Sequence, residues 1–424
     1  MIHAKKLKNG ARVHLIPYAG TDAATVLVLF KVGSRYEQLK VWGGSHYVEH
    51  LMFKGTKRRP NTVDISRELD RFGAEYNAYT GKDMTGYYVK IAAEQLPVAV
   101  DMLNDMLFHS LYSQVEMTRE KKVIIEEIKM YEENPVMHIE DLLEEAMFDG
   151  STLGRNIAGT AQSMMAMKRN DVIAYRDAYY TPERMVIAIA GKVPENAMAM
   201  LEKTFGTVKP RPEPTCFAPF GVMPSHKAPH VRRQEKPVKQ IQMAMGFPTV
   251  AKDHPDQPAI QLMANILGGS MSSRLFIEVR ERKGLCYHVR ATADAYEDVG
   301  MFVVRAGLDG ARLPLASKTI MQELIKMKKK GVTPLELRNV KDHIDGATKL
   351  SLEDSSSRAE FYARQELFLN QAETPAERLA KYRKVTAKDI QRVANEILDF
   401  SKLSIAAIGP YKTDEALLKE FPKF

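Results

Sequence analysis

One short segment, Gly44-Ser-His-Tyr-Val-Glu-His-Leu-Met-Phe-Lys-Gly55, carries two histidines and a glutamate at helical spacing. In a helix His50 lies about 40° round from His46 and Glu49 about 60° the other way, so the three side chains share one face. Two imidazoles one turn apart can bind one metal ion, with Glu49 beside it. The pattern H-x-x-E-H inverts the zinc-protease signature H-E-x-x-H, in which the glutamate is a general base rather than a ligand. The alternative is a chance match, since the chain has 11 histidines.

A catalytic zinc ion needs a third protein ligand, usually His or Glu, and leaves its fourth position to water. The segment 120–131 is the candidate source, because its spacing predicts a helix with one apolar face. The apolar stripe of this helix runs through Val123, Ile124, Ile128 and Tyr131.

Two glutamates of this helix point in the direction of the stripe. Glu127 lies in its middle, and Glu120 lies within about 20° of the same direction, whereas Glu126 points toward solvent. A carboxylate on an apolar face needs a compensating charge, which zinc would provide. We therefore expect one zinc ion per chain, held by His46, His50 and Glu127. The alternative is that Glu127 is an exposed residue on a frayed helix.

The sequence resembles the pitrilysin-type (inverzincin) zinc metallopeptidases, the family of insulin-degrading enzyme and mitochondrial processing peptidase. The resemblance rests on residues 44–56, followed 77 positions after His50 by Glu127, with Glu120 seven positions before Glu127. The resemblance extends through most of the chain. Among the members of the family, the chain resembles the single-chain, half-length members related to the processing peptidase.

This resemblance implies further site residues. Asn77 and Ala78 correspond to an edge strand that hydrogen-bonds the substrate backbone. Arg280 and Tyr287 correspond to a paired Arg and Tyr of the family's distal segment, in which Tyr287 would donate to the oxyanion and Arg280 would help to fix the substrate. Glu120 is expected to orient the metal ligands from outside the ligand set.

The implied function is that of a zinc-dependent endopeptidase acting on extended peptides or unfolded segments. Zinc would lower the pKa of its bound water toward about 7, and Glu49 would take the proton. One alternative is a catalytically inactive family subunit that acts as a structural or assembly partner, although the full set of ligands and base is present. Another is a non-proteolytic zinc-binding interaction protein, whose structural site would close the fourth position with protein.

A weak internal repeat runs along the chain. Gly73-Ala-Glu-Tyr76 recurs as Gly284-Leu-Cys-Tyr287, and Val186-Ile-Ala-Ile-Ala-Gly191 as Ser404-Ile-Ala-Ala-Ile-Gly409, at offsets of 211 and 218. Two collinear copies predict an α+β fold of two homologous domains, each a mainly antiparallel sheet covered by helices on one face.

The repeat also sets the predicted domain boundaries. Residues 1–208 are the zinc-bearing catalytic domain, and residues 238–424 are a homologous domain that carries the Arg/Tyr pair but no metal site, because residues 257–263 lack His and Glu. The intervening residues 209–237 hold seven prolines and predict an extended, semi-rigid linker. The predicted strands cover residues 25–32, 86–91, 186–190, 240–246, 300–305 and 403–408.

Composition narrows the class of protein. The net charge of +8 is spread along the chain without a nucleic-acid motif, so no nucleic-acid partner is expected. Cys216 and Cys286 give no disulfide framework, and Cys286 is expected to be a packed thiol because no Cys/His/Asn pattern accompanies it. No apolar run has the length of a membrane span and the N-terminus has no apolar signal core, so we expect no membrane association and a cytoplasmic location.

The resemblance also implies an assembly. Longer family members resemble two such chains fused, with the zinc site facing the Arg/Tyr segment of the far half. We therefore expect a homodimer in which the zinc site of one subunit meets Arg280 and Tyr287 of the partner subunit. The peptide substrate would pair with the edge strand near Asn77 by β-augmentation, which requires an extended chain.

Overall fold

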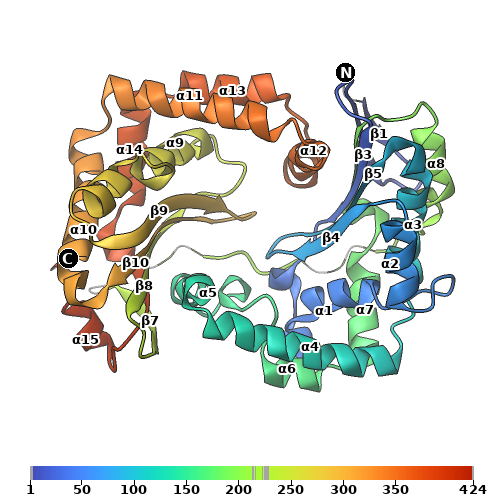
Figure 1. Ribbon diagram of the computed structural model, residues 1–424, viewed down its shortest axis with the longest axis horizontal. Coiled ribbons are helices and arrows are strands. Elements are labelled where there is room, and N and C mark those ends of the chain that lie inside the picture. The colour runs from blue at the N-terminus through green and yellow to red at the C-terminus, as the bar shows by residue number, and fades with distance from the viewer. Residues whose placement is uncertain (1–2, 213, 215, 222, 224–228, 423–424) are drawn as a thin grey trace. The chain divides into compact units, whose positions relative to one another are not determined.

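Two sets of apolar strands form two separate sheets in the computed structural model, which describes residues 3–212, 214, 216–221, 223 and 229–422 (Figure 1). Each sheet is the centre of one compact unit. Unit 1 comprises Met1–Lys129, Asn156–Ala218 and Thr348–Glu373, and unit 2 comprises Met130–Arg155, Pro219–Ala347 and Thr374–Phe424.

The sheet of unit 1 has six strands. Their order is β1 (His3–Lys6), β2 (Arg12–Pro17), β6 (Met185–Gly191), β3 (Ala23–Phe30), β5 (Thr85–Ala92) and β4 (Glu75–Thr80). The pair β2–β6 is parallel and all other neighbours are antiparallel. Strands β3 and β6 are continuous apolar runs because both of their faces are buried. Strand β4 is at the edge, so one side of its backbone pairs with no other strand of the described chain.

Helices cover both faces of this sheet. One face, with Val26, Val28 and Phe30, forms the larger core with helices from the first half of the sequence. These helices are α1 (Gly44–Met52), α2 (Thr62–Asp70), α3 (Leu96–His109), α4 (Gln114–Glu133), α6 (Ala161–Ala166), α7 (Arg169–Tyr179) and α8 (Ala197–Lys203). The opposite face, with Leu27 and Leu29, packs against α12 (Ser355–Leu369) from the second half.

The sheet of unit 2 repeats this order with five strands. They are β7 (His230–Glu235), β11 (Ser404–Gly409), β8 (Gln240–Thr249), β10 (Gly300–Asp309) and β9 (Cys286–Ala295). Again one pair, β7–β11, is parallel and the others are antiparallel. The remaining helices of unit 2 are α9 (Gln257–Gly268), α10 (Leu313–Lys330), α11 (Pro334–Ser351), α13 (Pro375–Lys384), α14 (Ala387–Ile397) and α15 (Asp414–Leu418).

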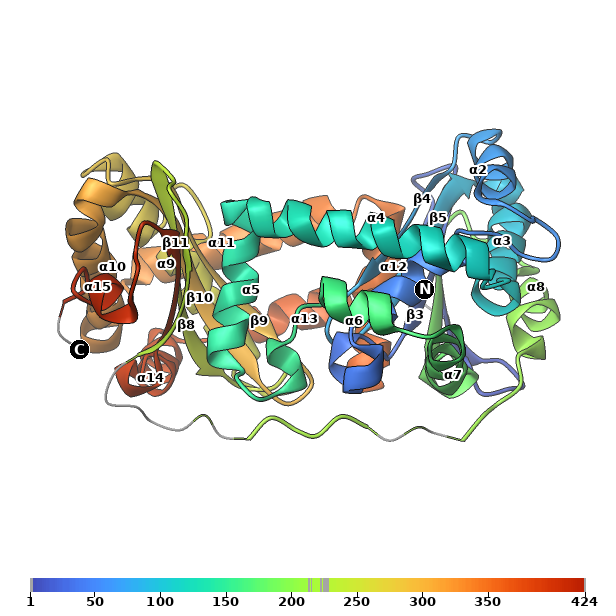
Figure 2. The ribbon, with the colours of Figure 1, turned by 90° about the horizontal axis from the view of Figure 1, so that it is seen from below.

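One helix of unit 2 comes from the first half of the sequence. Helix α5 (Pro135–Met147) packs its apolar side chains on Ala244, Val303 and Ala406. The helix lies on the face of the sheet opposite α9 and α14 (Figure 2). The halves therefore exchange one helix each, α5 for α12. The predicted α+β class with two similar, mainly antiparallel sheets is confirmed, but the prediction of helices on one face only is wrong. The helical spacing of 135–147 and 355–369 shows an apolar face without showing which sheet that face covers.

All six predicted strands are present, as β3, β5, β6, β8, β10 and β11. The predicted linker, residues 209–237, contains β7, which joins the sheet of unit 2. Part of that linker, residues 213, 215, 222 and 224–228, is outside the described residues. The predicted domain boundaries remain a prediction. They follow the sequence repeat, whereas the compact units are defined by contacts, and each unit includes a segment from the other half of the chain.

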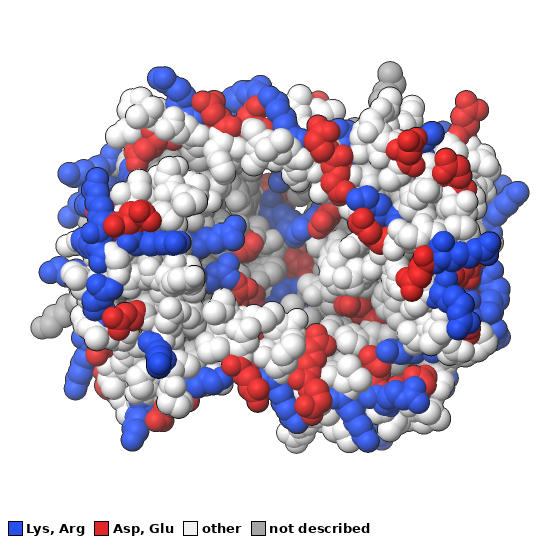
Figure 3. All heavy atoms as spheres, viewed as in Figure 1, with Lys and Arg blue, Asp and Glu red and all other residues white. Residues whose placement is uncertain are grey.

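Short helical turns complete the structure. They are the 3-10 segments Ser34–Tyr36, Leu39–Val41, Ala93–Gln95, Thr152–Gly154, Pro182–Arg184, Phe205–Thr207, Gly310–Arg312 and Phe400–Lys402, and a π-helical segment, Phe276–Glu281. On the face displayed in Figure 3, basic and acidic side chains are interspersed, as the even spread of charge along the sequence predicts. Within the described residues, no helix combines the length and the apolar character needed to cross a membrane.

Candidate metal centre

Helix α1 presents the H-x-x-E-H motif, and its first turn is fixed from outside the helix. The residue before it, Gly43, has a φ of 90°, and a Cβ there would lie 2.4 Å from the carbonyl oxygen of Ala158. Gly43 therefore offers no capping side chain. Glu37 takes this role, because its carboxylate accepts hydrogen bonds from the backbone N–H groups of Gly43 and Ser45, both at 2.7 Å. Complete burial raises the pKa of Glu37 to about 8, although both N–H groups oppose this.

Two further contacts hold α1 in place. The hydroxyl of Ser45 lies 2.7 Å from that of Tyr175 on α7. The hydroxyl of Tyr47 donates to the carbonyl of Met117 on α4 at 2.6 Å, which ties the two helices that carry the predicted ligands.

The three predicted metal ligands come together in unit 1. The Nε2 atoms of His46 and His50 lie 3.1 Å apart. Oε2 of Glu127 lies 3.7 Å from Nε2 of His46 and 3.5 Å from Nε2 of His50. Zinc bonds of about 2.0 to 2.2 Å in a tetrahedral site separate neighbouring ligand atoms by about 3.3 to 3.6 Å, and the three distances lie within about 0.2 Å of this range. Two imidazoles and one carboxylate are also a donor set typical of catalytic zinc, which keeps one position open.

Glu120 is hydrogen-bonded to one of these predicted ligands. Its Oε1 accepts a hydrogen bond from Nδ1 of His50 at 2.8 Å, and its Oε2 lies 2.8 Å from Nζ of Lys54. With Nδ1 as donor, Nε2 of His50 faces His46 and Glu127. Glu120 is buried, and the structure thus places it next to the ligand set, as the sequence predicts.

The electrostatics of the two histidines differ. Burial lowers the pKa of His50, but the carboxylates of Glu120 and Glu127 outweigh it and raise the pKa to about 9. Burial and the neighbouring His50 lower the pKa of His46. In the metal-free chain at neutral pH, His50 therefore holds a proton that must leave before its Nε2 can bind a metal.

Glu49 lies on the same side of α1 but is held apart from the ligands. Its Oε2 accepts a hydrogen bond of 2.5 Å from the hydroxyl of Thr80, the last residue of β4. Burial raises the pKa of Glu49, and the Thr80 hydroxyl and His50 oppose the rise. A raised pKa suits a carboxylate that must accept a proton near neutral pH.

The sequence did not single out Glu37 or Thr80. Glu37 could have been sought because a helix that begins after Gly43 has no capping side chain of its own. Thr80 could have been inferred from strand alternation. It lies two residues after Ala78, which is buried in the core that includes α1, so both side chains face the same side of β4.

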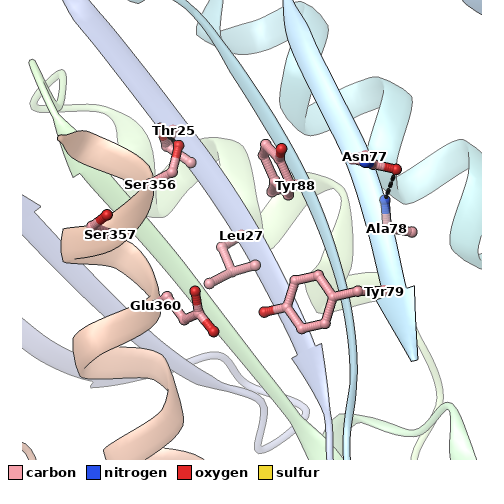
Figure 4. A pocket seen from close by; sticks show the side chains of 9 residues that line it. All are labelled: Thr25, Leu27, Asn77, Ala78, Tyr79, Tyr88, Ser356, Ser357 and Glu360. Carbon is pink, nitrogen blue, oxygen red and sulfur yellow. Dashed lines mark hydrogen bonds between the residues drawn. The ribbon is translucent and has the colours of Figure 1, made fainter. Parts of the chain in front are cut away.

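Strand β4 places Asn77 and Ala78 at the edge of the sheet. Oδ1 of Asn77 accepts a hydrogen bond from the backbone N–H of Ala78 at 2.9 Å (Figure 4). Their predicted role in substrate binding stays a prediction.

The exposed and buried positions of α4 agree only in part with the predicted ones. Glu126 is 72% exposed and lies 2.7 Å from Lys129, as predicted. Val123, assigned to the apolar stripe, is 48% exposed. The buried stripe of α4 is narrower than the sequence indicated, and it follows Met117, Glu120, Ile124 and Ile128.

Arg280 and Tyr287 lie in unit 2, whereas the metal ligands lie in unit 1. The guanidinium of Arg280 lies 5.9 Å from the ring centroid of Tyr287, whose side chain is 73% exposed. Whether they meet the metal ligands, in one chain or between two, stays a prediction. Burial raises the pKa of the neighbouring Cys286 to about 11, although Arg280 opposes this, which makes its thiol a poor nucleophile.

Two family models match the two halves of the chain separately, and relatives match nearly its full length. The family model for insulinase, peptidase family M16, matches residues 12–161, and the model for the peptidase M16 inactive domain matches residues 166–344. The uncharacterized zinc protease YmxG of Bacillus subtilis is 33% identical over 410 residues, covering 97% of this chain and 98% of that protein. An uncharacterized zinc protease of Streptomyces coelicolor is 32% identical over 97% of this chain and 90% of its own length.

Solved structures share the fold. A protease from Helicobacter pylori has a TM-score of 0.90 at 24% identity and covers 97% of this chain and 99% of its own. A peptidase M16 inactive domain from Pseudomonas fluorescens has a TM-score of 0.87 at 18% identity, over 97% of this chain and 98% of its own. The predicted family is confirmed, and the chain belongs to peptidase family M16, the insulinase family.

Proposed function

We propose that this chain is an active zinc-dependent endopeptidase that cleaves extended peptides or unfolded segments. The observation that carries the proposal is the spacing of His46, His50 and Glu127, which suits a tetrahedral zinc ion, with Glu49 beside them and outside the ligand set. A chain kept only for assembly needs neither the ligands nor the base.

When bound, zinc would polarise the substrate carbonyl and lower the pKa of its bound water. Glu49 takes the proton of that water and passes it to the leaving amine. Thr80 holds one oxygen of Glu49, which leaves the other free for the proton. Glu120 fixes the ring of His50 through Nδ1.

The substrate would lie along β4 as an added strand, with main-chain hydrogen bonds near Asn77 and Ala78. Arg280 and Tyr287 would then fix its backbone and stabilise the oxyanion from the partner subunit of a homodimer. The exposure of Tyr287 supports a role for its hydroxyl outside its own unit. A cytoplasmic location and the absence of nucleic-acid and membrane partners complete this proposal.

A catalytically inactive subunit is the second candidate, because one structural relative is described as an inactive M16 domain. The model of that name matches residues 166–344, which contain none of the proposed ligands and not Glu49. The match therefore fits an active chain with one inactive half as well as it fits an inactive chain.

Zinc analysis together with cleavage of a quenched library of unfolded peptides separates the candidates. We expect about one zinc per chain and cleavage by the wild type. Glu49→Gln should keep the zinc and lose about 10²- to 10⁴-fold in rate. A wild-type chain that holds zinc and cleaves nothing in a broad library would favour the inactive subunit.

A further inference from the structure

We propose that Lys54 is a positioning residue of the metal centre, whose ammonium group holds the Glu120 carboxylate in the direction in which that carboxylate fixes the ring of His50. This inference rests on the proposed function, because it takes His50 to be a zinc ligand.

The carboxylate of Glu120 joins two groups through its two oxygens. Oε1 accepts the hydrogen bond from Nδ1 of His50 at 2.8 Å, and Oε2 lies 2.8 Å from Nζ of Lys54. Rotation of the carboxylate about its bond to Cγ would break both contacts. The ammonium of Lys54 therefore restrains the oxygen that bonds His50, although Lys54 is not one of the predicted ligands.

The charge of Glu120 is balanced by few groups. Its side chain is 4% exposed, and among the described residues its ion-pair partners are His50 and Lys54. Zinc binds the neutral form of imidazole, so in a zinc-bound site Nδ1 of His50 donates a hydrogen bond but supplies no positive charge. Lys54 is then the side-chain cation that stays paired with this buried carboxylate. Without such a cation, burial of the carboxylate would be costly.

The backbone around Lys54 is held in one conformation. Lys54 lies two residues after the end of α1, and the next residue, Gly55, has a φ of 112°. A Cβ at Gly55 would lie 2.3 Å from the carbonyl oxygen of Pro60. The hydroxyl of Thr56 donates to the carboxylate of Asp105 on α3 at 2.7 Å. The stem of Lys54 thus starts from a fixed point, and its ammonium holds Glu120 without the entropy cost of ordering a loop.

A direct effect of the Lys54 charge on zinc would have the opposite sign. A cation near the site repels a divalent ion, so its removal would tighten zinc binding if Lys54 acted through its charge alone. Loss of the orientation of Glu120 would weaken zinc binding, because groups that orient a ligand contribute about 10- to 100-fold to metal affinity. The direction of the change in affinity therefore separates the two roles.

Competition for zinc with a fluorescent chelator, at one pH and ionic strength, measures this change. Lys54→Met keeps a stem of similar length without the charge and should weaken zinc binding about 5- to 20-fold. Lys54→Arg keeps a cationic donor for Oε2 and should stay within about threefold of the wild type. The control is Lys57→Met, which removes an exposed lysine of the same loop and should leave the affinity unchanged. Unchanged or tighter binding by Lys54→Met would overturn the positioning role.

A second comparison asks whether Lys54 acts through Glu120. In a Glu120→Gln background, Lys54→Met should change zinc affinity by less than about twofold, because the carboxylate that Lys54 holds is gone. A loss as large as in the wild-type background would overturn the proposal. If circular dichroism shows that Lys54→Met does not fold, Lys54→Gln replaces it, since its amide lacks the charge, and the same direction of change is expected.

Zinc binding and cleavage together separate this inference from the proposed function. A wild type that binds zinc and cleaves peptides, with unchanged affinity in Lys54→Met, overturns the role of Lys54 alone. Weaker zinc binding by Lys54→Met, without any cleavage by the wild type, supports the role of Lys54 and overturns the proposed activity. A wild type that binds no zinc overturns both.

Discussion

Helices α1 and α9 follow corresponding strands, β3 and β8, in two sheets with the same strand order, and they carry different chemistry. Helix α1 carries two histidines and a glutamate, whereas α9 contains no His, Asp or Glu and buries most of its residues in the core of unit 2. The frame of the fold therefore needs only apolar packing at this position. The His/Glu group of α1 is an addition to this frame. Glu120 bonds His50, Thr80 bonds Glu49, and Glu37 bonds the backbone N–H groups at the start of the helix.

The sharpest test of this contrast uses two adjacent residues of α4. Glu127→Ala should lose zinc and with it essentially all activity. Glu127 belongs to the one group of three or more His, Cys, Asp or Glu residues that could hold a metal ion among the described residues. Glu126→Ala should keep both, because Glu126 points to solvent. Metal analysis of the two variants distinguishes them. Zinc loss from Glu126→Ala but not from Glu127→Ala would show that Glu126, and not Glu127, faces the two histidines.

A second test asks whether the metal-free unit takes part in catalysis. Glu49→Gln impairs unit 1 and Tyr287→Phe impairs unit 2. In an equal mixture that exchanges subunits, half of the dimers are mixed and each holds one intact site, so about a quarter of wild-type activity should return if residues are shared in trans. Activity is followed after mixing, with exchange verified by differently tagged chains. No recovery despite exchange would rule out sharing between subunits.

A third test concerns the edge strands. At the offset of the Gly73 and Gly284 repeat, the position of Thr80 is held in unit 2 by Ala291, which has no hydroxyl. Thr80→Val should lower kcat about tenfold with little change in KM or zinc content, since a hydrogen bond to a charged group contributes about 1.5 to 3 kcal/mol. Thr80→Ser keeps the donor and should stay within about twofold of the wild type. Equal losses in both variants would point to packing rather than to the hydrogen bond.

The smallest effect is in the proton balance of zinc binding. The pKa of His50 is about 9 in the metal-free chain, so below that pH the ring must lose a proton to bind zinc. Zinc affinity should therefore rise about tenfold per pH unit from 6 to 8, with about one proton released per zinc. Calorimetry in buffers of different ionisation enthalpy measures the release. Glu120→Gln should reduce it, because that carboxylate raises the pKa of His50; an affinity independent of pH would contradict the assignment.

The sequence predicted those features that depend on local pattern. The central strands are long apolar runs. The spacing within 44–55 and 120–131 was enough to select His46, His50 and Glu127, which the structure brings together. Edge strands such as β1 and β9 carry weaker patterns, because one or both faces are open to solvent. Glu37 and Thr80 were missed because the absent cap of α1 and the alternation of β4 indicate where partners could lie without showing which atoms they bond.

The exchange of α5 and α12 has a consequence for how the chain is made. Synthesis proceeds from the N-terminus, yet the face of the first sheet with Leu27 and Leu29 packs against α12, which ends at Leu369. The nascent first half must therefore wait, with an apolar surface open to aggregation or to a chaperone, until most of the chain has left the ribosome. A chain cut within residues 209–229 would leave each fragment without a helix that its sheet requires.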